Sequence, residues 1–157
     1  MKEPTIKDIE KRLDRLVQTV QRCEGMVKVD GEWRSKCVTC HRYGPCFGKN
    51  CMQGGHFIPR GCRATRWEAA NVHPQCPRCN GFLNGAYLEY SHWMHERAPD
   101  VYEWLIDTYE AHKRGDAPRL SVVEKRALYN SWLQKGRKLE DYTGEKLFPK
   151  SWDYVKM

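Results

Sequence analysis

The chain has 157 residues, of which 40% are hydrophobic and 30% charged, a composition that suits one compact domain. Lys and Arg number 27 against 20 Asp and Glu, which gives a net charge of +7 at pH 7. No apolar run approaches the roughly 18 residues of a membrane span, and the N-terminal segment lacks the apolar core of a signal peptide. These features exclude a membrane protein, a collagen-like chain and a largely disordered chain, and they predict a cytoplasmic protein with no membrane partner.

The positive charge is unevenly distributed along the chain. Residues 1–60 carry 12 basic and 7 acidic side chains, residues 61–112 carry 4 and 7, and residues 113–157 carry 11 and 6. The two basic flanks are either ordinary solvated surface or a phosphate-binding rim around a central site. Because nucleic acid is the commonest acidic partner of a basic protein, nucleic acid is the partner we expect from the charge.

The first expected element is a helix over residues 5–22. Thr5 and Asp8 have the spacing of an N-terminal capping pair. Apolar residues then recur at steps of three and four, at Ile6, Ile9, Leu13, Leu16 and Val20. Such a stripe either packs against its own domain or forms the seam of a homodimer, and its length of little more than two heptads favours the first interpretation.

After a turn and short strand expected over residues 23–36, residues 37–80 contain seven of the eight cysteines. Two C-x-x-C pairs, Cys37 with Cys40 and Cys76 with Cys79, are separated by 35 residues. Four thiolates in tetrahedral geometry select zinc, and a closed four-ligand site is structural. A redox dithiol is the main alternative for one pair, but two pairs favour a shared zinc.

The remaining cysteines leave two interpretations open. A second zinc site is one, with His41 as a further ligand, and free or buried thiols are the other and the favoured one. The remaining cysteines are Cys23, Cys46, Cys51 and Cys62, and the second zinc would use Cys46, Cys51 and Cys62.

Two further helices are expected in the C-terminal part. One is capped by Asp100 with Glu103 and stops at Gly115. The next begins with an S-x-x-E capping box at Ser121 and stops at Gly136. Aromatic residues around and beyond its end are expected to dock on the domain, with stacking on bases as the lesser alternative; they are Tyr142, Phe148, Trp152 and Tyr154.

Polar residues suited to hydrolysis lie between and beside the two cysteine pairs. His56 follows two glycines, Asn71 and His73 precede the second pair, and Asn80 follows it directly. The cysteine pairs would bring these segments together, and a polar cluster on a rigid frame is what a hydrolytic site requires.

This order of motifs resembles the HNH, or ββα-metal (His-Me finger), nucleases, and more closely the phage NinG/Rap recombination endonucleases. The resemblance covers residues 37–90. It implies an α+β fold, mainly helical, with a small ββα-metal core closed by the four-Cys zinc. The expected single domain, 1–157, has its N-terminal helix in 1–22, its core in 37–95, and its helices and basic tail in 99–157. The matching residues are Gly55, His56, Phe57, Asn71, His73, Gln75, Cys76, Cys79, Asn80, Gly85 and Tyr90.

The resemblance also assigns roles. It makes His56 the general base, Asn71 the residue that orients it through the backbone, and Asn80 a ligand of a catalytic Mg²⁺ or Mn²⁺ ion. Gly55 stands where the family places a second metal ligand. His73 is the best substitute, because two residues beyond Asn71 on a strand it would face the same side; supporting a ligand or contacting DNA is its alternative role. Weaker alternatives for the ligand are Asn84, Glu89 and His92.

The resemblance to the NinG/Rap endonucleases implies an endonuclease that cuts branched DNA, namely Holliday junctions, D-loops and flaps, in a bacterial host cell. An unperturbed histidine titrates near ~6.5, so His56 would accept a proton at neutral pH. Arg60, Arg63 and Arg66 would contact DNA phosphates. Two alternatives remain: a zinc-held, non-catalytic nucleic-acid-binding adaptor, which Gly55 slightly favours, and a homing- or restriction-type HNH nuclease with sequence preference.

Overall fold

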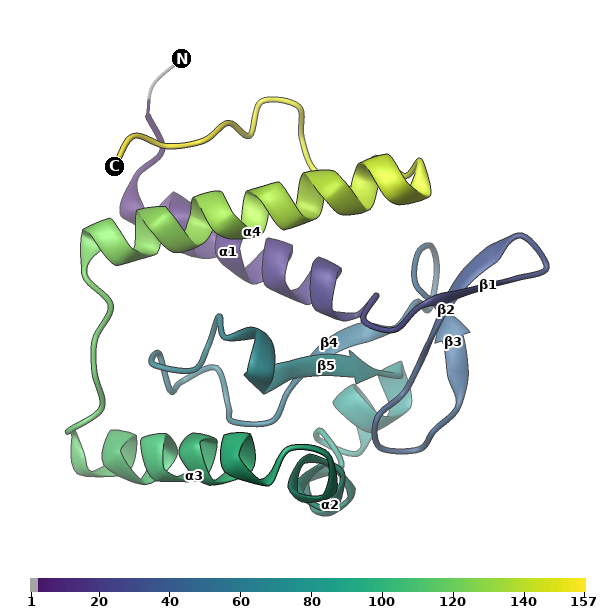
Figure 1. Cartoon of the computed structure of the whole chain (residues 1–157), viewed down its shortest axis with the longest axis horizontal. Helices are drawn as coiled ribbons and strands as arrows, with labels where there is room; N and C mark the ends of the chain where they lie inside the picture. Colours follow the sequence, from purple (N-terminus) through teal and green to yellow (C-terminus); the bar gives the residue numbers. More distant parts are fainter. Residues whose placement is uncertain (1–2) are drawn as a thin grey trace.

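The computed structural model describes residues 3–157, which form an α+β fold with more helix than strand (Figure 1). None of the helices in this range is long and apolar enough to cross a membrane. β1, β2 and β3 form one antiparallel sheet, and β4 and β5 form a separate antiparallel hairpin. The elements, in order, are α1 (Ile6–Gln21), β1 (Val27–Val29), β2 (Glu32–Lys36), β3 (Tyr43–Pro45), β4 (Gln53–His56), the 3-10 turn η1 (Ala69–Asn71), β5 (Val72–Gln75), the π-helical turn η2 (Arg78–Phe82), α2 (Tyr87–Arg97), α3 (Pro99–Arg114) and α4 (Val122–Thr143).

The N-terminal helix α1 lies between α4 and the β4–β5 hairpin (Figure 1). The expected capping box of Thr5 and Asp8 is confirmed. From the expected apolar stripe, Ile9, Leu13 and Leu16 are fully buried in a cluster shared with α4. The stripe therefore packs within its own chain, and the alternative of a dimer seam is wrong for these residues.

The last helix is longer than the sequence suggests. Its capping box at Ser121 is confirmed, but α4 continues through Gly136 to Thr143. A Cβ atom at position 136 would lie 2.7 Å from Cε2 of Phe148 and 3.1 Å from Cδ2 of Leu16. Gly136 thus permits close packing of helix and tail instead of ending the helix.

The aromatic residues of the C-terminal part divide into two groups. Phe148 is buried and Trp152 packs against the same apolar cluster, as expected for docking. Tyr142 is 68% exposed, yet its ring lies against Trp33 of β2, with 5.1 Å between the ring centroids. Tyr154 is 59% exposed, and the docking prediction is wrong for this residue.

Helices α2 and α3 cover the other side of the hairpin (Figure 1). α3 ends at Gly115 as expected, with φ of 84°. Its expected capping by Asp100 is wrong, because the helix begins with Pro99 and has no side-chain cap. A second apolar cluster beneath these helices includes Phe57, Ile58 and Leu105.

Residues 23–36 form a β-hairpin in place of a single strand. Val29 pairs with Glu32 across a two-residue loop. Asp30 and Gly31 have φ of 50° and 81°, the positive values that a tight hairpin turn needs. Strand β3 extends this sheet and carries the chain back toward the cysteine-rich segment.

Candidate functional site

Four cysteines meet where the two sheets approach each other. Cys37 and Cys40 follow β2, whereas Cys76 and Cys79 follow β5 and enter η2. Their sulfur atoms all lie within 4.8 Å of one another, with 3.7 Å between Cys40 Sγ and Cys76 Sγ. The predicted cluster is confirmed. Four thiols at this spacing could bind a structural metal such as zinc.

No second group of metal-ligating side chains occurs within residues 3–157. Cys62 is buried in the apolar cluster under α2 and α3. The thiol of Cys23 donates a hydrogen bond to the Thr19 carbonyl at 3.4 Å, and contact with the Cys46 thiol, together with burial, raises its pKa. The expected alternative of free or buried thiols is the one the structure favours over a second zinc.

The register of the β4–β5 hairpin decides which residues share a face. Gly55 pairs with His73, and His56 pairs with Val72. Because successive side chains alternate, His56 and His73 point to opposite faces of the hairpin. A Cβ atom at Gly54 would lie 2.8 Å from Cα of Gln18 in α1, which identifies the His56 face as the one toward α1. The structure does not bring His56 and His73 together.

His56 is half-buried and its ring is fixed by a backbone carbonyl. Its Nε2 lies 2.8 Å from the carbonyl oxygen of Arg66. Since a carbonyl only accepts, Nε2 carries the proton and Nδ1 is left with a free lone pair. Burial lowers the pKa of His56, although the carbonyl opposes this effect. The imidazole is therefore neutral at neutral pH and able to accept a proton at Nδ1.

Asn71 is fully buried and holds the loop that follows His56. Its Nδ2 donates to the carbonyls of Ile58 and Thr65, each at 3.0 Å, and its Oδ1 accepts from the amide of Ile58 at 2.6 Å. This loop continues to Arg66, whose carbonyl binds His56, so Asn71 holds the backbone segment that fixes the His56 ring. Asn71 ends η1 and β5 begins at Val72, so the strand alternation invoked for Asn71 and His73 does not extend to Asn71.

His73 is enclosed between the hairpin and α2. Its Nδ1 lies 2.9 Å from the hydroxyl of Tyr90, and that hydroxyl donates to the Gly55 carbonyl at 2.9 Å. Its Nε2 is 3.9 Å from Glu24 Oε2. Burial lowers the pKa of His73 to about 4. His73 is thus a neutral, hydrogen-bonded side chain between elements, and one ring nitrogen is already engaged.

Asn80 lies in η2, and its side chain contacts a residue that sequence reasoning missed. Its Nδ2 donates to Oε1 of Gln53 at 2.7 Å. Gln53 opens β4 and lines a depression of about 340 Å³ together with Gln18 of α1 and Arg22, the residue that follows this helix. Gln53 belongs to no motif, and only the fold reveals its contact with Asn80. The weaker ligand candidates Asn84, Glu89 and His92 are exposed, and Asn84 lies outside α2 with φ of 49°.

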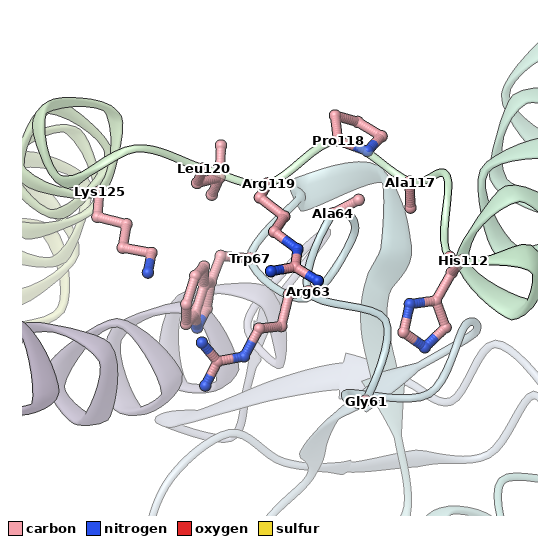
Figure 2. Close-up of a pocket in the computed structure, with 11 residues that line it drawn as sticks. Gly61, Arg63, Ala64, Trp67, His112, Ala117, Pro118, Arg119, Leu120 and Lys125 are labelled. Carbon is pink, nitrogen blue, oxygen red and sulfur yellow. The ribbon is translucent and has the colours of Figure 1, made fainter.

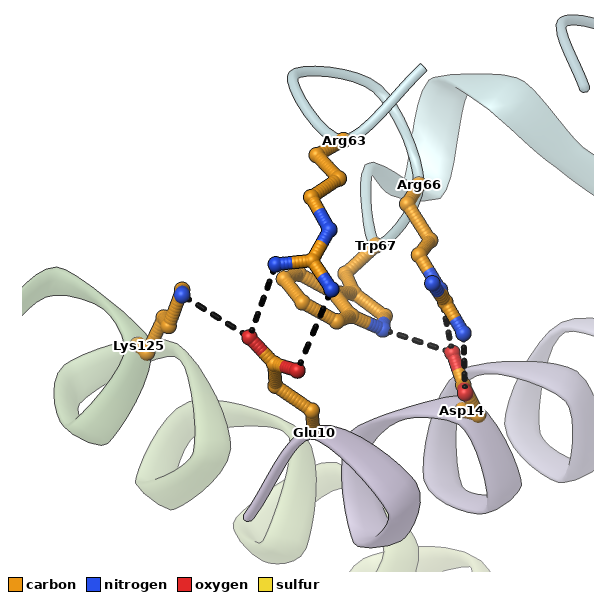
Figure 3. A network of polar contacts seen from close by, with 6 residues as sticks. All are labelled: Glu10, Asp14, Arg63, Arg66, Trp67 and Lys125. Carbon is orange, nitrogen blue, oxygen red and sulfur yellow. Dashed lines mark hydrogen bonds and ion pairs between the residues drawn. The ribbon is translucent and has the colours of Figure 1, made fainter. Parts of the chain in front are cut away.

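Two of the three expected DNA-contacting arginines are paired with carboxylates of α1 (Figure 3). Arg66 binds Asp14 through two hydrogen bonds of 2.8 and 2.6 Å, and Asp14 also accepts from Nε1 of Trp67 at 2.8 Å. Arg63 lies 3.4 Å from Glu10. These pairs fasten the loop after His56 to α1, so Arg66 has a structural role that sequence reasoning did not anticipate.

Arg60 is exposed and lines a groove along α1. The groove has a volume of about 470 Å³, and Lys11, Arg15 and Arg22 line it with Arg60. Its one carboxylate, Asp14, is already paired with Arg66. The His56 ring contacts the Arg66 carbonyl, and the Arg66 guanidinium binds Asp14 in this groove, so the imidazole lies near the groove. An anionic chain lying in the groove would therefore pass close to a neutral imidazole.

Comparison with protein-family models, curated proteins and solved structures finds no match for this chain. The geometry alone offers a neutral histidine with a fixed tautomer, a basic groove beside it, and two carboxamide side chains in contact near the four-cysteine cluster. This set can accept a proton and hold a polyanion.

Proposed function

We propose that this chain is a metal-dependent DNA endonuclease that cuts branched recombination intermediates, with His56 as general base. The observation that carries the proposal is the 2.8 Å contact between His56 Nε2 and the Arg66 carbonyl. It leaves Nδ1 as the only basic atom of a neutral ring. The preference for branched DNA rests on the motif resemblance.

Hydrolysis of a phosphodiester requires removal of a proton from water. His56 Nδ1 accepts that proton, and the positive charge then developing on the ring strengthens the bond from Nε2–H to the Arg66 carbonyl. Because the pKa of His56 is lowered from its usual value, the ring is neutral at neutral pH and Nδ1 carries no proton. Asn71 contributes by holding the loop that presents this carbonyl.

The groove beside His56 supplies the positive charge for binding DNA. Lys11, Arg15, Arg22 and Arg60 come from two segments and line one surface. Contacts to phosphates fix the position of a DNA strand without reading its sequence, which suits an enzyme selective for DNA structure.

Asn80 and Gln53 are the side chains that would hold a Mg²⁺ or Mn²⁺ ion. Their amide oxygens are neutral, so binding would be weak and substrate phosphate oxygens would complete the coordination. When bound, such an ion neutralises charge on the phosphate and on the leaving oxygen. The four-cysteine zinc would fix η2, which carries Asn80, against the end of β2.

A second candidate function is a non-catalytic DNA-binding adaptor. Two observations favour it: no carboxylate takes part in the contact between Asn80 and Gln53, and a ring nitrogen of His73 is engaged by the Tyr90 hydroxyl. An adaptor would use the same basic groove but would leave DNA intact.

Cleavage assays separate these functions. A Holliday junction, a D-loop and a linear duplex of matched sequence are incubated with Mg²⁺, Mn²⁺ or EDTA, using zinc-loaded full-length protein. The proposal predicts metal-dependent cutting that is confined to the branched substrates. Binding without cutting under every metal would indicate the adaptor, and cutting of the linear duplex at one sequence would indicate a homing- or restriction-type enzyme.

A further inference from the structure

A cavity of about 340 Å³ shares no lining residue with the groove along α1 and none with the cysteine cluster. Figure 2 shows the residues that line it. It is bounded by the loop after His56, the C-terminal end of α3, the connection 116–121 between α3 and α4, and the first turn of α4. The volume falls at the lower end of the range typical of small-ligand sites, roughly 300–1,000 Å³.

Basic side chains from separate segments reach this cavity. Arg63 comes from the loop, Arg119 from the connection and Lys125 from α4, and the His112 ring lines the cavity from α3 (Figure 2). Three cations gathered around one space repel one another unless anions compensate them. Their convergence therefore needs an explanation in terms of a partner charge.

The protein supplies only part of that compensation. Glu10 binds Lys125 at 2.8 Å and lies 3.4 Å from Arg63, so one carboxylate serves two cations (Figure 3). Arg119 has no ion pair and no side-chain hydrogen bond with any residue in the range 3–157. One guanidinium is thus available for a ligand, and its planar fork suits phosphate oxygens.

The rest of the cavity wall is apolar. It consists of Ala64, Trp67, Ala117, Pro118 and Leu120. A simple inorganic anion would use the guanidinium and leave this wall unused. A ligand that satisfies both parts carries a phosphate and a group with an apolar face, and a nucleotide provides both because the π-face of its base can pack on apolar side chains.

We infer that this cavity binds a nucleoside monophosphate unit, with the phosphate at Arg119 and Arg63 and the base against the apolar wall. The unit is either a free nucleotide or the 5′-terminal nucleotide of a DNA strand. The inference goes beyond the proposed cleavage and does not depend on it.

Calorimetric titration of the zinc-loaded full-length protein tests the site. The probes are dAMP, deoxyadenosine, inorganic phosphate, and a 5′-phosphorylated oligomer of deoxyadenylate. We expect saturable one-site binding of dAMP, and binding at least about tenfold weaker for deoxyadenosine and for phosphate alone. Tighter binding of the oligomer than of dAMP would identify a strand end as the source, and equal or weaker binding would identify the free nucleotide.

Two variants locate the binding. Arg119→Ala removes an exposed side chain and should weaken dAMP binding about tenfold or more. Arg114→Ala removes the same charge from the end of α3, outside the cavity, and should leave the affinity unchanged. The inference is overturned if both variants weaken binding equally, if phosphate binds as tightly as dAMP, or if neither dAMP nor the oligomer depends on Arg119.

The same titration separates this site from the proposed enzyme. If the wild type cuts no DNA but binds dAMP through Arg119, only the proposed function fails. If it cuts branched DNA and does not bind dAMP or the oligomer through Arg119, only the present inference fails.

Discussion

The Nε2 atom of His56 lies 2.8 Å from the carbonyl oxygen of Arg66, ten residues further along the chain. The guanidinium of the same Arg66 binds Asp14 of α1. One residue therefore fixes the tautomer of the base with its backbone and fastens the loop to a helix with its side chain. The proposed base is supported by contacts that span α1, the loop and the hairpin.

The pH dependence of cleavage should report on His56. Burial lowers its pKa below the usual value of about 6.5, and the ring acts as base only when neutral. Activity should therefore rise as pH increases through this lowered pKa and be fully developed at pH 7. Single-turnover rates between pH 5 and 8 measure it. A rate that rises tenfold per unit above pH 7 would show that another group is the base.

Removing the side chain of Asn71 should loosen the loop that presents the Arg66 carbonyl. Asn71→Ala leaves two carbonyls and one amide without their partner, and we expect a loss of about 2–4 kcal/mol in the free energy of unfolding. Cleavage should fall even at temperatures where the variant is folded. Urea unfolding and cleavage rates provide the readouts, with Gln134→Ala on the exposed side of α4 as control. Full activity in a folded Asn71→Ala would contradict the positioning role.

His73 should make stability depend on pH. Its pKa is about 4 in the folded protein and about 6.5 when unfolded, so the unfolded chain binds the proton first as pH falls. The stability that the neutral ring provides is complete above pH 6.5 and is lost between pH 6.5 and 4, by about 3 kcal/mol. Urea unfolding of the wild type and His73→Gln at pH 7 and 4.5 isolates the contribution of His73. Both proteins contain the same cysteine thiols, so any pH dependence that comes from the thiols is the same in the two. Equal losses in the two proteins would refute it.

The cysteine cluster should bind one zinc ion per chain. Cys76→Ser removes one thiolate and should lower both the zinc content and the unfolding temperature, because the metal connects the ends of β2 and β5. Cys62→Ser, in an apolar cluster, is the matched control and should retain zinc. Elemental analysis with thermal unfolding gives both readouts. A folded wild type that holds no zinc after purification with zinc present would contradict the assignment.

Gly136 should not tolerate a side chain. Alanine is favoured over glycine in a helix by about 1 kcal/mol, yet its Cβ would meet Phe148 at 2.7 Å. Overpacking of this kind costs roughly 1–3 kcal/mol, so Gly136→Ala should be destabilising or at best neutral. Chemical unfolding decides, with Ser131→Ala in the exposed part of the same helix as control. A gain of about 1 kcal/mol at position 136 would show that the tail moves aside.

Local signals predicted the helices better than the site. The capping boxes at Thr5 and Ser121, and the stop at Gly115, depend on neighbouring residues and are confirmed. The prediction that the last helix stops at Gly136 was wrong, because this glycine makes room for Phe148, which follows the helix in the sequence and packs against it. Like the capping boxes, each C-x-x-C pair is a local pattern, and it predicted the cysteine cluster because a metal site strongly restricts the spacing of its ligands.

The relationships within the site were mostly beyond the sequence. The contact of Asn80 with Gln53 and the engagement of His73 by Tyr90 follow from strand register, which no motif encodes. The pairing of Arg66 with Asp14 likewise depends on how α1 crosses the hairpin. The spacing of residues in the sequence was enough to select the candidate site residues. Only the fold shows which face of the hairpin each side chain occupies and which residues it contacts.

The central claim is that His56 acts as the base in DNA cleavage. Its most direct test is the single-turnover rate of Holliday-junction cleavage with Mg²⁺ or Mn²⁺ for the wild type and His56→Ala, with His95→Ala as an exposed histidine control on α2. We predict a loss of 10²–10⁴-fold, the range typical of a general base, for His56→Ala alone. Cleavage by His56→Ala at the wild-type rate, or no cleavage by the wild type with either metal, would contradict the account.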